Sequence, residues 1–168
     1  MQVSFWEKQS FYSPKDVIIV GAGLAGLWSA LELHKRNPKL KILILERGVL
    51  PQGASTRNAG FACFGSPTEL LHDAQTLGED KMWETVEMRY RGIEKIRSSF
   101  GDGAIEFDNC GGYELLGDAA DTPENFDDKL HWLNAGLKPI TSVDNTFIKN
   151  NNRINDFKFN QFTSLRFS

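Results

Sequence analysis

The sequence predicts an α/β fold built on a βαβ unit, in which two parallel strands are joined by a crossover helix. Three observations predict it: two apolar runs, the glycine-rich turn after the first run, and the amphipathic stretch between them. In chain order these are Asp16–Val20, the turn Gly21–Gly26, the stretch ending at Asn37, Lys41–Leu45 and Glu46. Parallel strands need a crossover of this length, usually a helix.

The turn after the first apolar run has the glycine spacing of a nucleotide-binding unit. Gly21 allows a tight turn, Gly23 lets a diphosphate approach the backbone, and Gly26 lets helix and strand pack closely. The helix start offers free N–H groups and the positive end of its dipole to phosphates. The pattern alone is weak evidence, but here it follows a strand and opens a helix. We therefore expect a nucleotide site at Gly21, Ala22, Gly23, Leu24, Ala25 and Gly26.

An acid closes the unit. Glu46 follows the second apolar run, 20 residues past Gly26. At that place a carboxylate accepts hydrogen bonds from the ribose hydroxyls of an adenosine. A 2′-phosphate would meet a like charge there, so the sequence disfavours NADP. The alternative, an ordinary glycine-rich turn, would leave the strand, helix and acid spacing to coincidence.

Further elements follow from local pattern. Ser66-Pro67-Thr68-Glu69 is a capping box with proline at the first helical position. The expected elements are a short lead-in helix over 4–10, the first strand over 16–20, a helix over 24–36, the second strand over 40–45, helices to 77 and over 79–99, a hairpin of 104–108 with 113–116, a helix from 122 to 135 capped by Gly136, and strand character over 157–162.

Composition excludes several function classes. With 22 acidic and 19 basic residues the formal net charge is −3, so nucleic acid is not an expected main partner. No apolar stretch is long enough to span a membrane, and the first residues lack a signal-peptide pattern. Two cysteines make no disulfide framework, which favours a cytoplasmic location. The three histidines are scattered, so we expect no metal site, and no residue is identified as catalytic.

A second motif follows Glu46 directly. The segment Gly53–Gly60 is rich in small residues, which let a backbone approach a ligand closely. It also carries Ser55, Arg57 and Asn58, whose side chains suit phosphate or a flavin ring. FAD needs a second contact directly after the ribose acid, whereas NAD usually does not. The motif therefore favours FAD as the cofactor.

The two motifs resemble those of the D-amino-acid-oxidase-like (DAO) FAD-dependent oxidoreductases, in particular the subgroup that contains gamma-glutamylputrescine oxidase. The resemblance rests on Gly21–Gly26, Glu46-Arg47, Gly53–Gly60 and Cys110–Leu115. It implies that the glycine turn holds the FAD diphosphate, that Glu46 binds ribose and that Arg47 flanks the adenine. It also implies that the phosphates and ribityl chain are reached from Ser55, Thr56, Arg57 and Asn58. The family moves a hydride from a substrate C–H beside an amine to the flavin.

The resemblance also predicts the organisation of the chain. It implies a Rossmann-type FAD-binding portion over 14–103 and the beginning of an antiparallel substrate-domain sheet over 104–168. Because family members are much longer, we expect an incomplete fold, an N-terminal fragment that binds FAD weakly and oxidises no amine. The alternatives are an NAD-linked dehydrogenase and a nucleotide-binding fragment without catalysis. The small-molecule substrate is expected to be an amine or amino acid, whereas its identity, the electron acceptor and the oligomeric state stay open.

Overall fold

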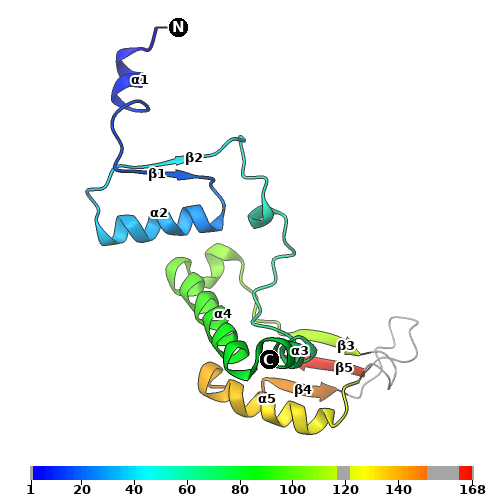
Figure 1. Ribbon diagram of the computed structural model, residues 1–168. Coiled ribbons are helices and arrows are strands. Elements are labelled where there is room, and N and C mark those ends of the chain that lie inside the picture. The colour runs from blue at the N-terminus through cyan, green and yellow to red at the C-terminus, as the bar shows by residue number, and fades with distance from the viewer. Residues whose placement is uncertain (1, 117–121, 151–162, 168) are drawn as a thin grey trace, which may run out of the picture. The chain divides into compact units, whose positions relative to one another are not determined.

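The computed structural model describes residues 2–116, 122–150 and 163–167 (Figure 1). The chain divides into two compact units, Met1–Phe61 and Ala62–Ser168, here called the N-terminal and C-terminal units. Each is described by itself.

The N-terminal unit contains the predicted βαβ unit. It comprises α1 (Phe5–Gln9), β1 (Val17–Val20), α2 (Leu24–Arg36), β2 (Ile42–Leu45) and the 3₁₀ turn η1 (Ala54–Thr56). Strands β1 and β2 pair in parallel, from Val17 opposite Ile42 to Val20 opposite Leu45. Helix α2 covers one face of this sheet (Figure 1). The result confirms the α/β class and the Rossmann-like arrangement that the glycine pattern predicts.

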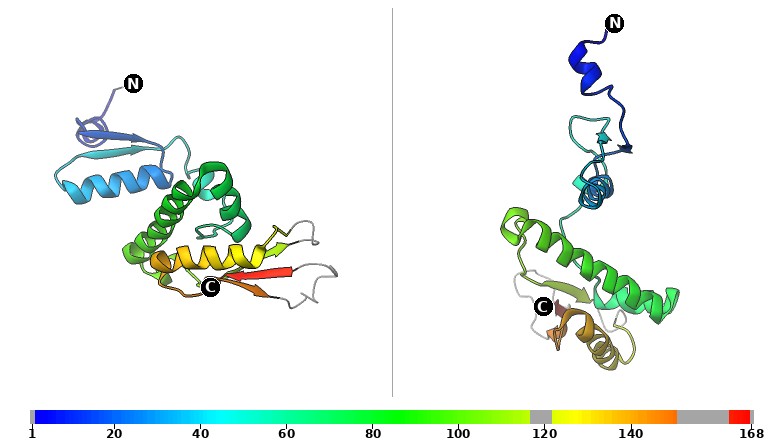
Figure 2. Two further views of the ribbon diagram at one scale, coloured as in Figure 1. Left: turned by 60° about the horizontal axis from the view of Figure 1, so that its bottom comes forward. Right: turned by 90° about the vertical axis from the view of Figure 1, so that its left-hand side faces the viewer.

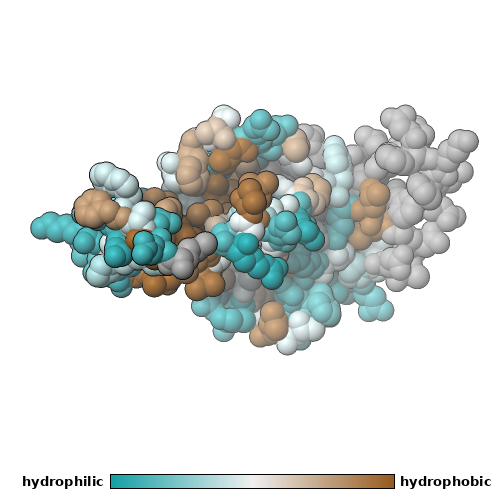
Figure 3. Space-filling model, turned by 90° about the horizontal axis from the view of Figure 1, so that it is seen from above, coloured by the Kyte–Doolittle hydropathy of each residue, from teal (hydrophilic) through white to brown (hydrophobic). Residues whose placement is uncertain are grey.

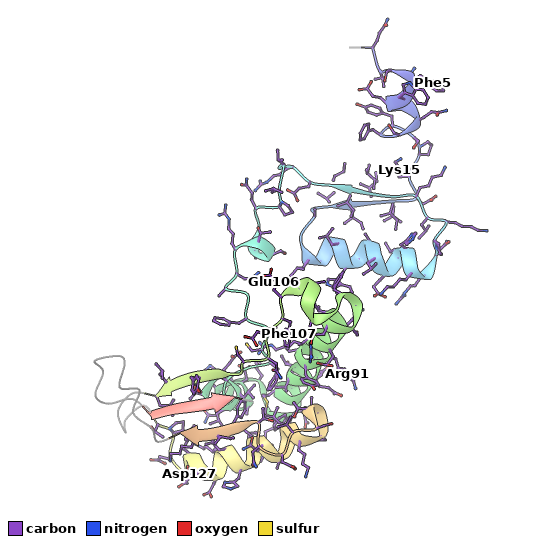
Figure 4. All side chains as sticks on the ribbon, turned by 180° about the vertical axis from the view of Figure 1, so that it is seen from behind. Phe5, Lys15, Arg91, Glu106, Phe107 and Asp127 are labelled. Carbon is purple, nitrogen blue, oxygen red and sulfur yellow. The ribbon has the colours of Figure 1, made fainter. Side chains whose placement is uncertain are left out.

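The other face of that sheet is open within the unit. Along β1 the half-buried Val17 and Ile19 alternate with Ile18 and Val20, which are 57% and 86% exposed. None of the described side chains of the N-terminal unit is buried. Apolar side chains reach the surface among polar ones in Figure 3, and Phe5 projects from α1 in Figure 4. A parallel sheet normally has both faces covered, so this unit lacks a core of its own.

The C-terminal unit has a packed core. Its elements are α3 (Pro67–Leu77), α4 (Glu79–Phe100), the 3₁₀ turn η2 (Asp102–Ile105), β3 (Gly112–Leu116), α5 (Phe126–Thr141), β4 (Phe147–Asn150) and β5 (Thr163–Phe167). The three strands form an antiparallel sheet in the order β3-β5-β4. Helix α5 lies along this sheet (Figure 2). The buried apolar residues are Leu70, Leu71, Met82, Val86, Leu116, Phe126, Leu130, Leu133, Leu137 and Phe147.

The predicted hairpin of 104–108 with 113–116 is wrong. Residues 102–105 form η2, and β3 pairs with β5 instead. The guanidinium of Arg97 holds both carboxylate oxygens of Asp102 at 2.9 and 2.8 Å and lies 4.6 Å from the centre of the Phe107 ring. These contacts fold the chain back on the end of α4, so it cannot extend as a strand. Glu106 and Phe107 lie in this return segment (Figure 4).

The boundaries predicted for the last helix are also wrong. Helix α5 begins at Phe126 and continues through Gly136, the expected cap, to Thr141. Gly136 serves packing instead, because a Cβ there would lie 2.2 Å from a ring carbon of Trp83. The helix ends at Thr141 and is followed by its C-cap residue Ser142, whose φ of 62° is left-handed. The strand character expected over 157–162 lies outside the described residues.

A tertiary contact replaces the predicted capping box of α3. Ser66 is the N-cap residue, but its side chain does not cap the helix. Instead Glu114 of β3 accepts from the Ser66 hydroxyl at 2.7 Å and from the Thr68 amide at 3.2 Å, and it also accepts from the Thr68 hydroxyl. One carboxylate therefore both caps α3 and ties it to the sheet.

Replacing Gly136 by alanine should destabilise the C-terminal unit, because the added methyl group overlaps the Trp83 ring. We expect a loss of about 1–3 kcal/mol in the free energy of unfolding, measured by urea denaturation. Gly92→Ala in α4 is the matched control, since nothing lies within 4 Å of a Cβ there. That control should stabilise by about 0.5–1 kcal/mol. Equal effects of the two substitutions would contradict the packing role of Gly136.

Replacing Glu114 by glutamine should cost about 1–3 kcal/mol of unfolding free energy, because an amide nitrogen cannot accept hydrogen bonds from the start of α3. Urea denaturation measures this loss of unfolding free energy. Glu87→Gln is the control, because within the described residues Glu87 forms an exposed ion pair with Arg91 at 2.5 Å and no hydrogen bond or ion pair to another element, and that loss should not exceed about 0.5 kcal/mol. A loss at Glu114 no larger than this would show that its carboxylate does not cap α3.

Candidate nucleotide-binding site

A cavity of about 300 Å³ lies within the N-terminal unit, at the carboxyl ends of β1 and β2. Open α/β sheets bind ligands at this edge. The volume is at the lower end of the range of ligand sites, about 300–1,000 Å³, and so suits part of a dinucleotide. The cavity is lined by Val20, Gly21, Gly23, Leu45, Glu46, Arg47, Pro51, Gln52, Gly53 and Ser55.

The glycine turn is shaped by close backbone contacts. Gly21 has a φ of 101°, which L side chains rarely adopt, and its amide donates to the Leu45 carbonyl at 2.7 Å. A Cβ on Gly26 would lie 2.1 Å from the Gly21 carbonyl oxygen. Larger residues at Gly21 or Gly26 would therefore distort the junction of β1 and α2. Gly23 lines the cavity directly.

Glu46 joins the two strand ends. Its carboxylate accepts from the Ala22 amide at 2.9 Å and from the Gly48 amide at 3.2 Å. These hydrogen bonds, that from Ala22 foremost, lower the pKa of Glu46 below its ordinary value. The half-buried carboxylate therefore stays ionised and fixed at the cavity wall. Each oxygen keeps a lone pair that can accept from a hydroxyl group.

The start of α2 supplies backbone donors. Its N-cap, Gly23, has no side chain, and the Leu24 amide donates to the Ser55 hydroxyl at 2.9 Å. Among the described residues, the first-turn amides of Ala25 and Gly26 have no protein acceptor. Such amides, together with the helix dipole, favour an anion.

The second loop brings one of its four predicted residues to the cavity. Ser55 lines it, whereas Thr56, Arg57 and Asn58 do not. The Thr56 hydroxyl donates to the Pro51 carbonyl at 2.8 Å. The Asn58 side chain donates to the Ser55 carbonyl at 3.0 Å and accepts from the Gly60 amide at 2.8 Å. Thr56 and Asn58 therefore hold the loop in shape, and Arg57 is exposed.

The structure thus gathers Gly21, Gly23, Glu46, Arg47 and Ser55 around one cavity, with Ala22 contributing through its bond to Glu46. Sequence reasoning missed Val20, Leu45, Pro51 and Gln52 as lining residues, because none of them stands in the spacing of a binding motif. In the part of the chain that the structure describes, no group of three or more metal-ligating side chains comes together. None of the described helices is long and apolar enough to cross a membrane.

One family model and several known proteins match this chain. The model of the DAO family, FAD dependent oxidoreductase, matches residues 16–146. L-2-hydroxyglutarate dehydrogenase, mitochondrial, from Dictyostelium discoideum is 33% identical over 57% of this chain and 19% of its own length. The probable oxidoreductase OrdL from Haemophilus influenzae is 33% identical over 60% of this chain and 23% of its own length.

A third relative matches a shorter stretch of the chain. Thiamine thiazole synthase from Yarrowia lipolytica is 45% identical over 51 residues, 30% of this chain and 16% of that protein. The chain spans less than a quarter of the length of each of these three relatives. No solved structure matches.

The family model covers well over half of the chain, including the glycine turn, Glu46 and the second loop. The cavity fits its cofactor, since Glu46 offers a carboxylate for ribose hydroxyls and Gly23, the N-cap residue of α2, lines the same cavity. The chain therefore belongs to the DAO family of FAD-dependent oxidoreductases, whose cofactor is FAD.

Proposed function

We propose that this chain binds the adenosine diphosphate half of FAD in the cavity of the N-terminal unit, as part of an oxidoreductase that acts on the CH–NH group of an amine or amino acid. The observation that carries the binding proposal is the placement of Glu46 and of Gly23, the N-cap residue of α2, around one cavity at the strand ends. The proposed substrate class comes from the resemblance of the sequence to the gamma-glutamylputrescine-oxidase-like subgroup.

In this proposal, different cavity residues bind different parts of the cofactor. Glu46 binds the ribose, Arg47 lies beside the adenine, and the turn from Gly21 to Gly26 faces the diphosphate. Ser55 faces the diphosphate from the second loop, while Thr56 and Asn58 brace that loop. Arg57 is exposed, so a contact to the cofactor requires its long side chain to reach over the loop. When bound, FAD would supply the acceptor for the hydride of the substrate C–H, the substrate nitrogen would give up a proton, and water would hydrolyse the resulting imine.

A second substrate class has support from one relative. The Dictyostelium relative is named for L-2-hydroxyglutarate, a 2-hydroxy acid, and it matches 57% of this chain. Oxidation of a CH–OH group would remove a hydride from carbon and a proton from the hydroxyl group, and would leave a carbonyl. Family membership, by contrast, favours FAD over the NAD-linked alternative.

We further propose that residues 14–103 belong to the FAD-binding portion and that 104–168 begin the substrate domain. Two observations support the proposal that amine oxidation requires further parts of the family's fold besides these residues. The chain spans less than a quarter of its relatives' length, and no described side chain of the N-terminal unit is buried. By itself, the chain should bind FAD weakly and oxidise no amine. A cytoplasmic location stays a prediction from composition.

The binding proposal predicts that the purified chain recognises FAD through its adenosine diphosphate half. Titrations followed by flavin fluorescence should show weak, saturable binding of FAD, and ADP should compete with it. FMN, which carries the same flavin without the adenosine, should not bind. Equal binding of FMN and FAD would contradict the assignment of the cavity.

Substrate class is tested on a family-length relative beside this chain. Anaerobic reduction of the flavin, followed by absorbance, would be compared for primary amines, amino acids and 2-hydroxy acids. We expect the relative to be reduced by an amine or amino acid and this chain to show no reduction. Reduction only by 2-hydroxy acids would replace the amine proposal by the second candidate.

Glu46→Gln should weaken FAD binding about tenfold, because one charge-assisted hydrogen bond is lost. Glu32→Gln on α2, outside the cavity lining, is the matched control and should bind as wild type. The lowered pKa of Glu46 sets the pH dependence. Wild type should bind FAD more tightly than Glu46→Gln throughout the pH range in which an ordinary glutamate titrates. This difference in affinity should disappear only at lower pH. An advantage lost within that range would contradict the role of the fixed carboxylate.

A further inference from the structure

The amino-terminal edge of the N-terminal unit lies at the opposite end of the sheet from the cavity. It comprises the lead-in over 2–16, the last turn of α2 and the connection over 37–41. Lys41 joins these segments, because its carbonyl accepts from the Asp16 amide at 3.0 Å and its amide donates to the Asp16 carboxylate at 2.8 Å. In Figure 1 the start of β1 and the end of α2 lie together at this end. A partner bound here would leave the cavity open.

This edge carries a cluster of positive charge, here called the basic cluster. Residues 33–41 contain no acid, and their exposed lysine and arginine side chains are those of Lys35, Arg36, Lys39 and Lys41. Lys35 lies 3.9 Å from Glu32, whereas no acid among the described residues forms an ion pair with the other three. The chain as a whole has a formal net charge of −3. Such a concentration of cations favours an anionic partner at this edge.

The lead-in adds exposed aromatic side chains to the same edge. Their exposed fractions lie between 62% and 75%, and they are Phe5, Trp6, Phe11 and Tyr12. The lead-in is held in place beside β1, because the Lys15 ammonium donates to the Ser10 carbonyl at 2.6 Å. Figure 4 shows Phe5 on α1 and Lys15 at the start of β1. The rings therefore project from an ordered segment next to the basic cluster.

We propose that the amino-terminal edge docks on an anionic phospholipid surface. Tryptophan and tyrosine side chains favour the boundary between lipid headgroups and acyl chains, because one end of each ring system is apolar and the other is polar. Basic side chains are attracted to anionic headgroups. A peripheral protein is held stably when two such signals act together, and this edge provides both. The proposal does not depend on what the cavity binds.

Two other partners fit this edge less well. A second copy that used the same patch on both chains would bring two basic clusters opposite each other, and like charges repel. A nucleic acid would meet the same cations, but domains that bind nucleic acids carry a positive net charge, whereas this chain is at −3. The exposed rings also have an aliphatic neighbour, Val3, which is 39% exposed and suits acyl chains better than bases.

The experiment measures how the full chain co-sediments with vesicles of phosphatidylcholine and with vesicles of phosphatidylcholine and phosphatidylglycerol in equal amounts. We expect binding to the mixed vesicles, little binding to phosphatidylcholine alone, and a loss of binding as salt is raised, because salt screens exposed charges. Equal binding to both kinds of vesicle would contradict the role of the basic cluster. Absence of binding to either would overturn the proposal.

Charge is tested with the double variant Lys39→Gln/Lys41→Gln, which should bind the mixed vesicles about tenfold more weakly or worse. Lys81→Gln/Lys138→Gln is the matched control, because it removes the same charge from exposed lysines of the C-terminal unit. That control should bind as wild type does. Far-UV circular dichroism checks that both variants are folded. Equal weakening in the two would show that only net charge matters and would contradict docking through this edge.

Insertion of the rings is tested at Trp6. Trp6→Ala should weaken binding about tenfold, and Trp6→Phe should restore most of it while losing the blue shift of tryptophan emission that wild type shows on mixed vesicles. Met88→Ala is the control, because Met88 is 66% exposed on α4 in the C-terminal unit. Wild-type affinity in Trp6→Ala, without a blue shift in wild type, would show that the rings do not enter the lipid and would overturn the docking mode.

The competing partners give results of their own. A dimer seen by light scattering that dissociates in Trp6→Ala, in a chain that does not bind vesicles, would assign the edge to a second copy. Binding of duplex DNA but not of vesicles at the same salt concentration would assign it to nucleic acid. Either result would overturn the membrane proposal and leave the proposed nucleotide site untouched.

Discussion

The pairing of β1 with β2 is the constraint on which the site depends. Parallel pairing brings Val20 and Leu45 side by side, so the glycine turn and Glu46 emerge at the same edge. Glu46 then fixes this edge by accepting from Ala22 on one side and Gly48 on the other. The acid that the sequence assigns to ribose is therefore also part of the framework. A ligand at this edge meets a carboxylate whose position is already set.

The two units differ in what stabilises them. Burial of apolar surface dominates the C-terminal unit, where α3, α4 and α5 share a core with the antiparallel sheet. The described N-terminal unit has a covered face and an open one, on which Ile18 and Val20 are exposed. Its order rests on strand pairing, on α2 and on hydrogen bonds at the strand ends. Anything that binds only the ordered form of this unit, FAD included, adds to its stability.

Sequence patterns predicted what is local and missed what is tertiary. The helix over 24–36 is confirmed as α2, because glycine spacing and apolar periodicity act within a few residues. The hairpin at 104–108 failed because Arg97 holds Asp102 from the preceding helix. Gly136, a plausible helix cap, is instead a packing surface for Trp83. In the site, spacing identified Glu46 and the glycines, whereas only the folded loop separates Ser55 from Thr56 and Asn58.

Two amides of the glycine turn are satisfied by the protein's own side chains, Ala22 by Glu46 and Leu24 by Ser55. Both acceptors come from segments far along the chain, so the turn, the end of β2 and the second loop form one hydrogen-bonded frame. Ordering these segments costs conformational entropy. Here the hydrogen bonds to Glu46 and Ser55 order them without a ligand. Binding then has less order to create, which favours affinity. A unit without buried side chains among its described residues can thus still hold a formed cavity, because the frame is made by directed polar bonds at the strand ends.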